Sequence, residues 1–214
     1  MFADRLEAAE QLAQALQRYR NRRPLILAIP RGAVPMGAVL AHRLGGELDV
    51  VMVRKLRAPG APEFAVGAID EMGWAYVAPH AETAGATRAY LEEEQRGQLR
   101  EMRRRRALYT PGRLPVDAEG RTVIVVDDGL ATGATMIAAL HAVRERKPAL
   151  LVCAVPVASP DSLEQVRPYA DEIVCLQAPA GFRAVGQFYR WFPQVEDEEV
   201  VALLGAGGTS APVR

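Results

Sequence analysis

Two adjacent carboxylates, Asp127 and Asp128 (the acid pair), follow directly after the short apolar run 123–126. A strand buried on both faces has such a continuous apolar sequence, and open α/β sheets bind ligands beyond the carboxyl ends of their strands. The next residues, here called the anion loop, open a helical pattern: Gly129, Leu130, Ala131, Thr132, Gly133, Ala134 and Thr135. Carboxylates bind hydroxyls and hydrated Mg²⁺, whereas amides at a helix start bind phosphate. A sugar phosphate carries both kinds of group.

A second turn of this kind comes earlier in the chain. The apolar run 25–29 leads through a proline into Arg31, Gly32 and Ala33, and Pro35 marks the start of a helix. Backbone amides at such a turn, with a cation beside them, form a second candidate anion site.

Cations also follow the next apolar run. Residues 48–53 lead into Arg54 and Lys55. Lys55 is one of only two lysines in a chain that otherwise uses arginine, which indicates a need for a compact ammonium group.

The elements that must position these groups alternate along the chain. Apolar runs predict parallel strands at residues 25–29, 48–53, 123–126, 150–155 and 173–176. Helical periodicity predicts helices at residues 4–19, with Asp4 as N-cap, and at 36–44, 87–108, 136–146, 162–169 and 197–204. Such alternation predicts an α/β fold with a parallel doubly wound sheet. Residues 63–69 and 74–78 are expected to form a hairpin.

Composition limits the class of protein. The chain has 214 residues, half of them hydrophobic, and no formal net charge, so neither nucleic acid nor a membrane is an expected partner. The run 103–106 of four arginines has no interleaved aromatics and is interpreted as a solvated or self-associating face. Cys153 and Cys175 lie in apolar runs and are expected to be reduced core thiols of a cytoplasmic protein. No signal peptide or membrane-spanning run is visible.

The stretch 123–135, Val-Ile-Val-Val-Asp-Asp-Gly-Leu-Ala-Thr-Gly-Ala-Thr, resembles the phosphoribosyl pyrophosphate (PRPP) binding signature of type I phosphoribosyltransferases. The likeness includes the strand, the two acids and the Thr-Gly-x-Thr loop together. It implies the type I phosphoribosyltransferase fold, PRPP as donor, Mg²⁺ as cofactor, and transfer to a nitrogenous base with release of pyrophosphate. It also implies a homodimer.

The resemblance assigns roles to named residues. Arg31, Lys55, Asp127 and Asp128 are the implied catalytic residues, and the acid pair also holds Mg²⁺, partly through water. The anion loop is the implied site of the 5′-phosphate, and Arg31, Gly32, Ala33 and Arg54 that of the pyrophosphate. The corresponding family loop often contains an unusual cis peptide, so a cis bond near Pro30–Arg31 is hypothesised.

Two covering segments complete the implied architecture of a single domain, residues 1–204. Residues 59–86 are the candidate lid, which would exclude water from an activated sugar. Residues 177–204 are the candidate hood, where Phe182, Val185 and Trp191 are expected to cover the base. A hydrophobic plug over the sheet edge explains the hood's aromatics equally well. Residues 205–214 are expected to be a disordered tail.

The sequence leaves the acceptor and the outcome of binding open. Ala131 stands where 6-oxopurine enzymes of the family have a third acid, so the loop is nearer to the adenine type, yet the hood does not select adenine. A PRPP-sensing regulator on the same fold is the main alternative to an enzyme. A hydrolase of phosphorylated ribose is a third reading and would need a base poised on water.

Overall fold

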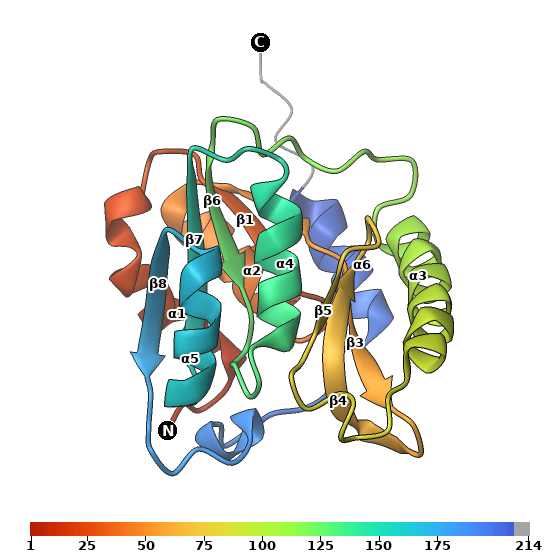
Figure 1. The fold of residues 1–214 in the computed structure, drawn as a ribbon. Helices are drawn as coiled ribbons and strands as arrows, with labels where there is room; N and C mark the ends of the chain where they lie inside the picture. Colours follow the sequence, from red (N-terminus) through yellow and green to blue (C-terminus); the bar gives the residue numbers. More distant parts are fainter. Residues whose placement is uncertain (208–214) are drawn as a thin grey trace.

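A five-stranded parallel sheet forms the centre of the molecule (Figure 1). The structure, a computed structural model, describes residues 1–207, apart from the side chains at positions 62 and 63. The strand order is β2-β1-β6-β7-β8. These strands are β1 (Leu25–Ala28), β2 (Glu47–Val50), β6 (Thr122–Val126), β7 (Leu150–Val157) and β8 (Glu172–Gln177). The predicted parallel doubly wound sheet is therefore confirmed.

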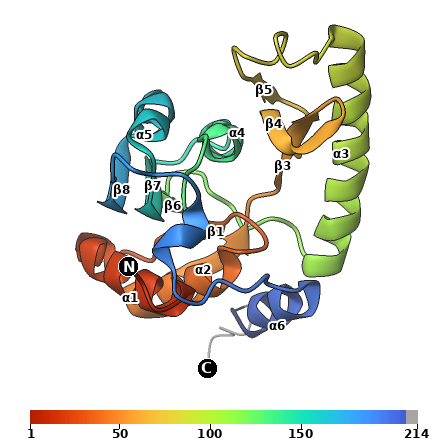
Figure 2. The same cartoon turned by 90° about the horizontal axis from the view of Figure 1, so that it is seen from below.

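Alternating side chains of the strands feed a separate core on each face of the sheet. Ile26, Ile124 and Val152 belong to one core, whereas Leu27, Val125 and Cys153 belong to the other. The first is covered by α1 (Arg5–Ala15) and α2 (Val34–Leu44), the second by α4 (Ala134–Arg144) and α5 (Pro160–Val166). Figure 2 shows these helix pairs on opposite sides of the sheet. Strands buried on both faces explain the continuous apolar runs.

A second, antiparallel sheet stands beside the first and consists of β3 (Val53–Ala58), β4 (Ala61–Asp70) and β5 (Ala75–Val77). The predicted hairpin is confirmed as β4 and β5. The predicted strand 48–53 is wrong at its end, because β2 stops at Val50 and β3 begins at Val53. Arg54 and Lys55 consequently lie inside a strand rather than after one. The three cations among its six residues obscured this strand.

The long helix α3 (Arg88–Tyr109) flanks the second sheet (Figure 1). It carries the arginine run, much of which is engaged within the molecule. Arg104 and Arg105 each lie 2.8 Å from Glu101, and Arg106 lies 2.6 Å from Glu71. The pairs with Glu101 lie within α3, whereas the pair with Glu71 joins the helix to the turn of the hairpin.

Helix ends follow the signals in the sequence at the start of the chain and depart from them at the end. The side chain of Asp4 accepts a hydrogen bond from the N–H of Glu7, so its predicted role as N-cap is confirmed. The last helix, α6 (Asp197–Gly207), runs past the predicted end at residue 204. Leu204 is buried in the core, and this packing carries the helix across Gly205 despite the low helix propensity of glycine. Residues 205–207 are therefore helical, and 208–214 lie outside the described residues.

Both cysteines are free, as expected. Cys153 is buried in β7 and Cys175 is half-buried in β8. Burial raises the pKa of the Cys153 thiol. Cys153 in particular behaves as a small apolar core residue.

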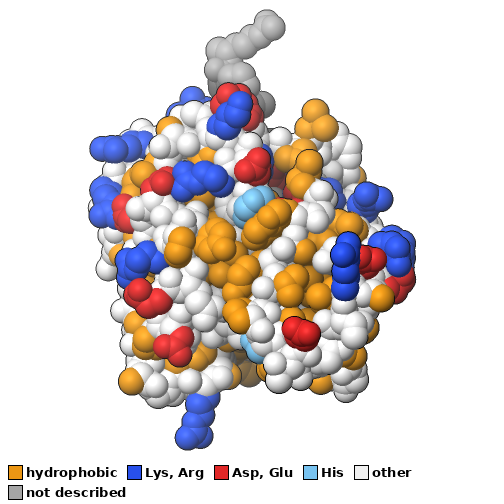
Figure 3. Space-filling view, viewed as in Figure 1, with side chains coloured by type: hydrophobic (Ala, Val, Ile, Leu, Met, Phe, Trp, Pro, Cys, Tyr) orange, Lys and Arg blue, Asp and Glu red, His pale blue; other side chains and the backbone are white. Residues whose placement is uncertain are grey.

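The surface is mixed. Figure 3 shows hydrophobic side chains gathered over α4 and the antiparallel sheet, with charged side chains towards both sides of that view. Within residues 1–207, no helix has the length and apolar character that crossing a bilayer requires.

Candidate functional site

A cavity opens where the strand order reverses, at the carboxyl ends of β1 and β6. Since α2 and α4 cover opposite faces of the sheet, the loops that lead into them part here and leave room for a ligand. The cavity has a volume of about 260 Å³. It is lined by Ile29, Pro30, Gly32, Lys55, Asp127, Asp128, Gly129, Leu130, Ala131, Thr132, Gly133, Thr135, Met136 and Val185. The acid pair and nearly all of the anion loop thus form its wall, while Ala134 starts α4 and does not line it.

The two carboxylates of the acid pair come directly after β6. The N–H of Asp128 donates to Oδ1 of Asp127 at 2.9 Å. Burial raises the pKa of Asp127 well above its ordinary value, and the neighbouring Asp128 raises it further. Burial also raises the pKa of Asp128, against the opposing effect of the Arg5 guanidinium. A ligand that brings hydroxyl donors or positive charge to this pair relieves the cost of two adjacent desolvated carboxylates.

The anion loop is held from behind by the end of β7 and the start of α5. Leu130 donates from its N–H to the carbonyl of Val157 at 2.9 Å, and the carbonyl of Leu130 accepts from the N–H of Ser159 at 3.1 Å and from the hydroxyl of Ser162 at 3.2 Å. Gly133, with a φ of 74°, is the N-cap of α4 and adopts a left-handed conformation that other residues resist. The first amides of α4 have no intrahelical acceptor and so suit a phosphate.

The turn between β1 and α2 contributes backbone to the cavity. The peptide bond between Pro30 and Arg31 is cis, as hypothesised. Gly32 lines the cavity, whereas Ala33 is fully buried and caps α2. A Cβ on Gly32 would lie 2.3 Å from Oδ2 of Asp128. Only glycine therefore lets this turn approach the acid pair so closely.

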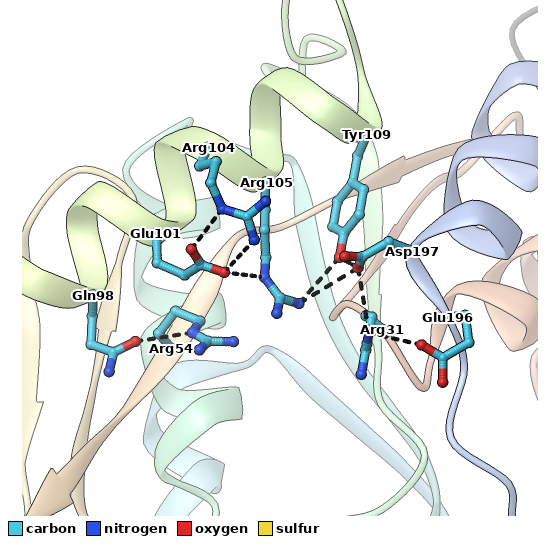
Figure 4. Close-up of polar contacts among 9 residues, drawn as sticks. All are labelled: Arg31, Arg54, Gln98, Glu101, Arg104, Arg105, Tyr109, Glu196 and Asp197. Atoms are coloured by element: carbon cyan, nitrogen blue, oxygen red, sulfur yellow. Dashed lines mark hydrogen bonds and ion pairs between the residues drawn. The ribbon is translucent and has the colours of Figure 1, made fainter.

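The side chain of Arg31 is not among the residues that line the cavity and lies beside Glu196 and Asp197 instead (Figure 4). Its catalytic and pyrophosphate-binding roles stay predictions. Its guanidinium lies 3.4 Å from Glu196 and 3.5 Å from Asp197, at the start of α6. Asp197 also accepts a hydrogen bond from the hydroxyl of Tyr109 at 2.5 Å. The guanidinium of Arg31 is therefore ion-paired with two carboxylates that are distant from it in the sequence.

Lys55 and Arg54 point to opposite sides of β3, since neighbours on a strand alternate. Lys55 lines the cavity. Arg54 donates from Nε to the side-chain oxygen of Gln98 on α3 at 3.0 Å (Figure 4). Burial and the nearby charge of Arg105 lower the pKa of Arg54. Of these two predicted cations, Lys55 lines the cavity and Arg54 does not.

The hood reaches the cavity through one of its three expected residues. Val185 lines the cavity. Phe182 stacks on Phe188, with ring centroids 5.4 Å apart, and does not line it. Trp191 is 69% exposed and lines a separate surface hollow. The expected stacking of Phe182 or Trp191 over the cavity is therefore not seen, because the first ring packs within the hood and the second lies on the outer surface.

The hood is joined to the start of the chain. Phe2 forms a parallel bridge with Tyr189, and its N–H donates to the carbonyl of Phe188 at 2.8 Å. The N–H of Trp191 donates to the carbonyl of Ala3 at 2.9 Å. The hydroxyl of Tyr189 donates to the backbone carbonyl of Asp128 at 2.7 Å. The hood, the chain start and the acid pair are thus one connected unit.

Sequence reasoning missed several contributors. Ile29, Pro30 and Met136 flank the predicted loops, so extending each loop by a residue or two would have included them. Arg5, whose side chain bonds Asp128, gave no such signal. In the sequence it is an ordinary first-turn residue of a helix.

The chain belongs to the phosphoribosyl transferase domain family, whose model matches residues 3–189. The match includes every strand of the central sheet, the acid pair and the anion loop. The resemblance noted from residues 123–135 is therefore confirmed at the level of the family.

Two proteins of Mycobacterium tuberculosis are among the similar relatives, the provisionally assigned phosphoribosyl transferases MT0597 (strain CDC 1551 / Oshkosh) and Rv0571c (strain ATCC 25618 / H37Rv). Each is 41% identical over 210 residues, which are 95% of this chain and 46% of the relative. The chain thus spans about half the length of these relatives. Among the solved structures, the crystal structure of TT1426 from Thermus thermophilus matches this one with a TM-score of 0.79 and 46% sequence identity. The match covers 95% of this chain and 97% of that chain.

Proposed function

We propose that the protein is a phosphoribosyltransferase that takes PRPP as donor and transfers its phosphoribosyl group to a nitrogenous base, releasing pyrophosphate. One observation carries the proposal: a single cavity at the switch point of the sheet is lined by the acid pair, the anion loop and Lys55. PRPP has phosphates at both ends of one ribose. Its recognition therefore requires two anion sites with hydroxyl acceptors between them.

The proposed placement follows from the lining. The 5′-phosphate binds the anion loop and the first amides of α4, as anions do at helix N-termini. The ribose hydroxyls donate to the acid pair, and the pyrophosphate lies towards Gly32 and Lys55. As the bond to pyrophosphate breaks, the carboxylates stabilise positive charge on the ribose, while Lys55 stabilises the leaving group.

The acid pair also fits Mg²⁺. Across residues 1–207 there is no group of three or more His, Cys, Asp and Glu side chains placed to hold a metal ion. Mg²⁺ in sites that bind substrate phosphates needs only one or two carboxylates, the remaining ligands being water and phosphate oxygens. Asp127 and Asp128 supply these. Bound there, the ion would neutralise negative charge on the departing pyrophosphate.

The acceptor is proposed only as a nitrogenous base. Val185 is the hood residue that touches the cavity, and Ala131 offers no charge to a base. A homodimer and a cytoplasmic location remain predictions.

Calorimetry with PRPP and Mg²⁺ tests the donor. We expect the wild type to bind PRPP, and we expect Thr132→Val and Asp128→Asn each to weaken this binding by about tenfold or more. Thr132→Val removes a hydrogen-bond donor to the phosphate, and Asp128→Asn removes a charged acceptor for the ribose hydroxyls. Both variants should remain folded, which thermal unfolding checks. Absence of PRPP binding by the wild type would refute the proposal, and unchanged affinity in both variants would refute the placement.

A PRPP sensor without turnover is the second candidate, and the orientation of Arg31 favours it. With its charge held by Glu196 and Asp197, Arg31 is not placed to stabilise a leaving group. A screen of nucleobases for pyrophosphate release separates the two functions. Release with any base supports the transferase, and tight PRPP binding without release from any base supports the sensor.

A further inference from the structure

Arg5, the first residue of α1, reaches the acid pair from a part of the chain that no motif marks. Its Nε and Nη2 donate to Oδ2 of Asp128 at 3.0 and 2.9 Å. The side chains of Arg5 and Asp128 are only 10% and 17% exposed. A charge-assisted pair shielded in this way is stronger and more directional than one on the surface.

The guanidinium of Arg5 is itself fixed by the hood. Its Nη1 donates to the carbonyl of Pro193 at 2.7 Å, and its central carbon lies 3.7 Å from the centre of the Phe192 ring. Phe192 stacks on Tyr189, which bonds the backbone of Asp128. All three nitrogens of Arg5 are thus engaged, and the planar group has one available orientation.

Gly32 approaches the same oxygen of the Asp128 carboxylate. A Cβ at that position would lie 2.3 Å from Oδ2 of Asp128 and 3.3 Å from Nη2 of Arg5. The guanidinium of Arg5 and the backbone of the turn after β1 therefore enclose Oδ2 of Asp128 together. Among the described residues, the hydrogen bonds to this oxygen come from Arg5.

We propose that Arg5 is a positioning residue of the acid pair: it orients the Asp128 carboxylate for the ribose of the donor and links that orientation to the seated hood. Both bonds end on Oδ2, so Arg5 aligns the carboxylate through one of its two oxygens. The inference rests on the proposed use of PRPP. It adds a residue that acts through Asp128 and does not touch the ligand.

A double-mutant cycle tests this role. The dissociation constant of PRPP in the presence of Mg²⁺ is measured by calorimetry for the wild type, Arg5→Met, Asp128→Asn and the double variant. We expect Arg5→Met to weaken binding by about tenfold in the wild-type background, the effect of losing a hydrogen bond to a charged group, and to have no effect beside Asp128→Asn. Arg5→Lys, which keeps the charge and one donor, should recover part of the loss.

A matched control is Arg43→Met. Arg43 lies in α2 and pairs at 2.8 Å with Glu10, which is in α1 like Arg5. This pair is on the exposed surface, away from the cavity, so the loss of Arg43 should leave PRPP affinity unchanged. Melting temperatures of all variants show whether each remains folded. If Arg5→Met weakens binding by the same factor in both backgrounds, Arg5 does not act through Asp128 and the inference is overturned. If the wild type does not bind PRPP, the proposed function fails first and this inference fails with it.

Discussion

The loop after β6 and the turn after β1 leave the same edge of the sheet and enter helices on opposite faces, yet they build the cavity differently. After β6, both acids and almost every residue of the anion loop line the cavity. After β1, Pro30 and Gly32 line it, while the side chain of Arg31 is drawn to α6 and Ala33 is buried. The first loop presents its chemistry through its own residues. The second presents backbone, and the orientation of its arginine side chain depends on partners that are distant in the sequence.

The difference reflects what fixes each group. In the anion loop, Gly133 and the bonds of Leu130 to β7 set the backbone, and the backbone sets the amides. A flexible arginine has no such local constraint, so the carboxylates that surround it decide where it points. A sequence motif thus predicts a binding site reliably where the backbone of the motif forms the contacts.

The largest test of the comparison removes the close approach of the β1 turn. Gly32→Ala places a Cβ within 2.3 Å of Asp128 and forces the turn or the acid pair to move. We expect PRPP affinity to fall by about 100-fold or more, since such displacements of positioned groups cost that much. Calorimetry measures the loss.

Gly97→Ala is the matched control. A Cβ on Gly97 of α3 would meet only the end of Arg100, at 3.9 Å. Affinity should be unchanged and the free energy of unfolding should rise by up to about 1 kcal/mol, because alanine is the better helix former. Equal affinity in both variants would mean that the turn does not need to approach the acids.

Lys55 and Arg54 give the next contrast. Lys55→Met should weaken PRPP binding by about 10- to 100-fold, because it removes the cation that lines the cavity. Arg54→Met should instead lower the free energy of unfolding by about 1 kcal/mol, since Gln98 loses its donor. Binding and thermal unfolding of the two variants decide. A larger loss of affinity in Arg54→Met would reverse the assignment.

Asp127 tests whether the acid pair is held at a cost to stability. Its pKa is raised in the folded protein, so the folded state holds the proton more tightly than the unfolded chain does. Stability is therefore lost as pH rises from about 3.8, the ordinary value, towards the raised pKa. At neutral pH, Asp127→Asn should therefore raise the free energy of unfolding, because the amide carries no charge that burial penalises.

That gain should disappear below the ordinary pKa, where the wild-type carboxyl is protonated in both states. The same variant should lose PRPP affinity. Thermal unfolding across pH measures the first effect and calorimetry the second. A variant less stable than the wild type at neutral pH would show that the acid pair is not destabilising.

The smallest effect concerns the partners of Arg31. Glu196 is exposed and lies 3.4 Å from the guanidinium. Glu196→Gln should raise PRPP affinity by about twofold at low ionic strength, because a surface ion pair that competes for Arg31 is worth about 1 kcal/mol or less. A loss of affinity would indicate that Glu196 holds Arg31 in its working position.

The sequence predicted what is dictated locally. Apolar runs located the five parallel strands, Asp4 marked a helix start, and the residues of the acid pair and anion loop marked the cavity. Strand β3 was missed because its cations conceal a period of two. The orientations of Arg31 and Arg5 could not be predicted, since their partners lie 165 and 123 residues away. Such pairings exist only once the fold has brought the two segments together.

The bridge between Phe2 and Tyr189 has a consequence for biosynthesis. Phe2 and Ala3 cannot complete this pairing until the ribosome has made residues 188–191, which supply the other half. A nascent chain can complete the central sheet after β8 and still lack the hood and the seat of Arg5. The cavity is thus completed later in synthesis than the strands of the sheet that carries it.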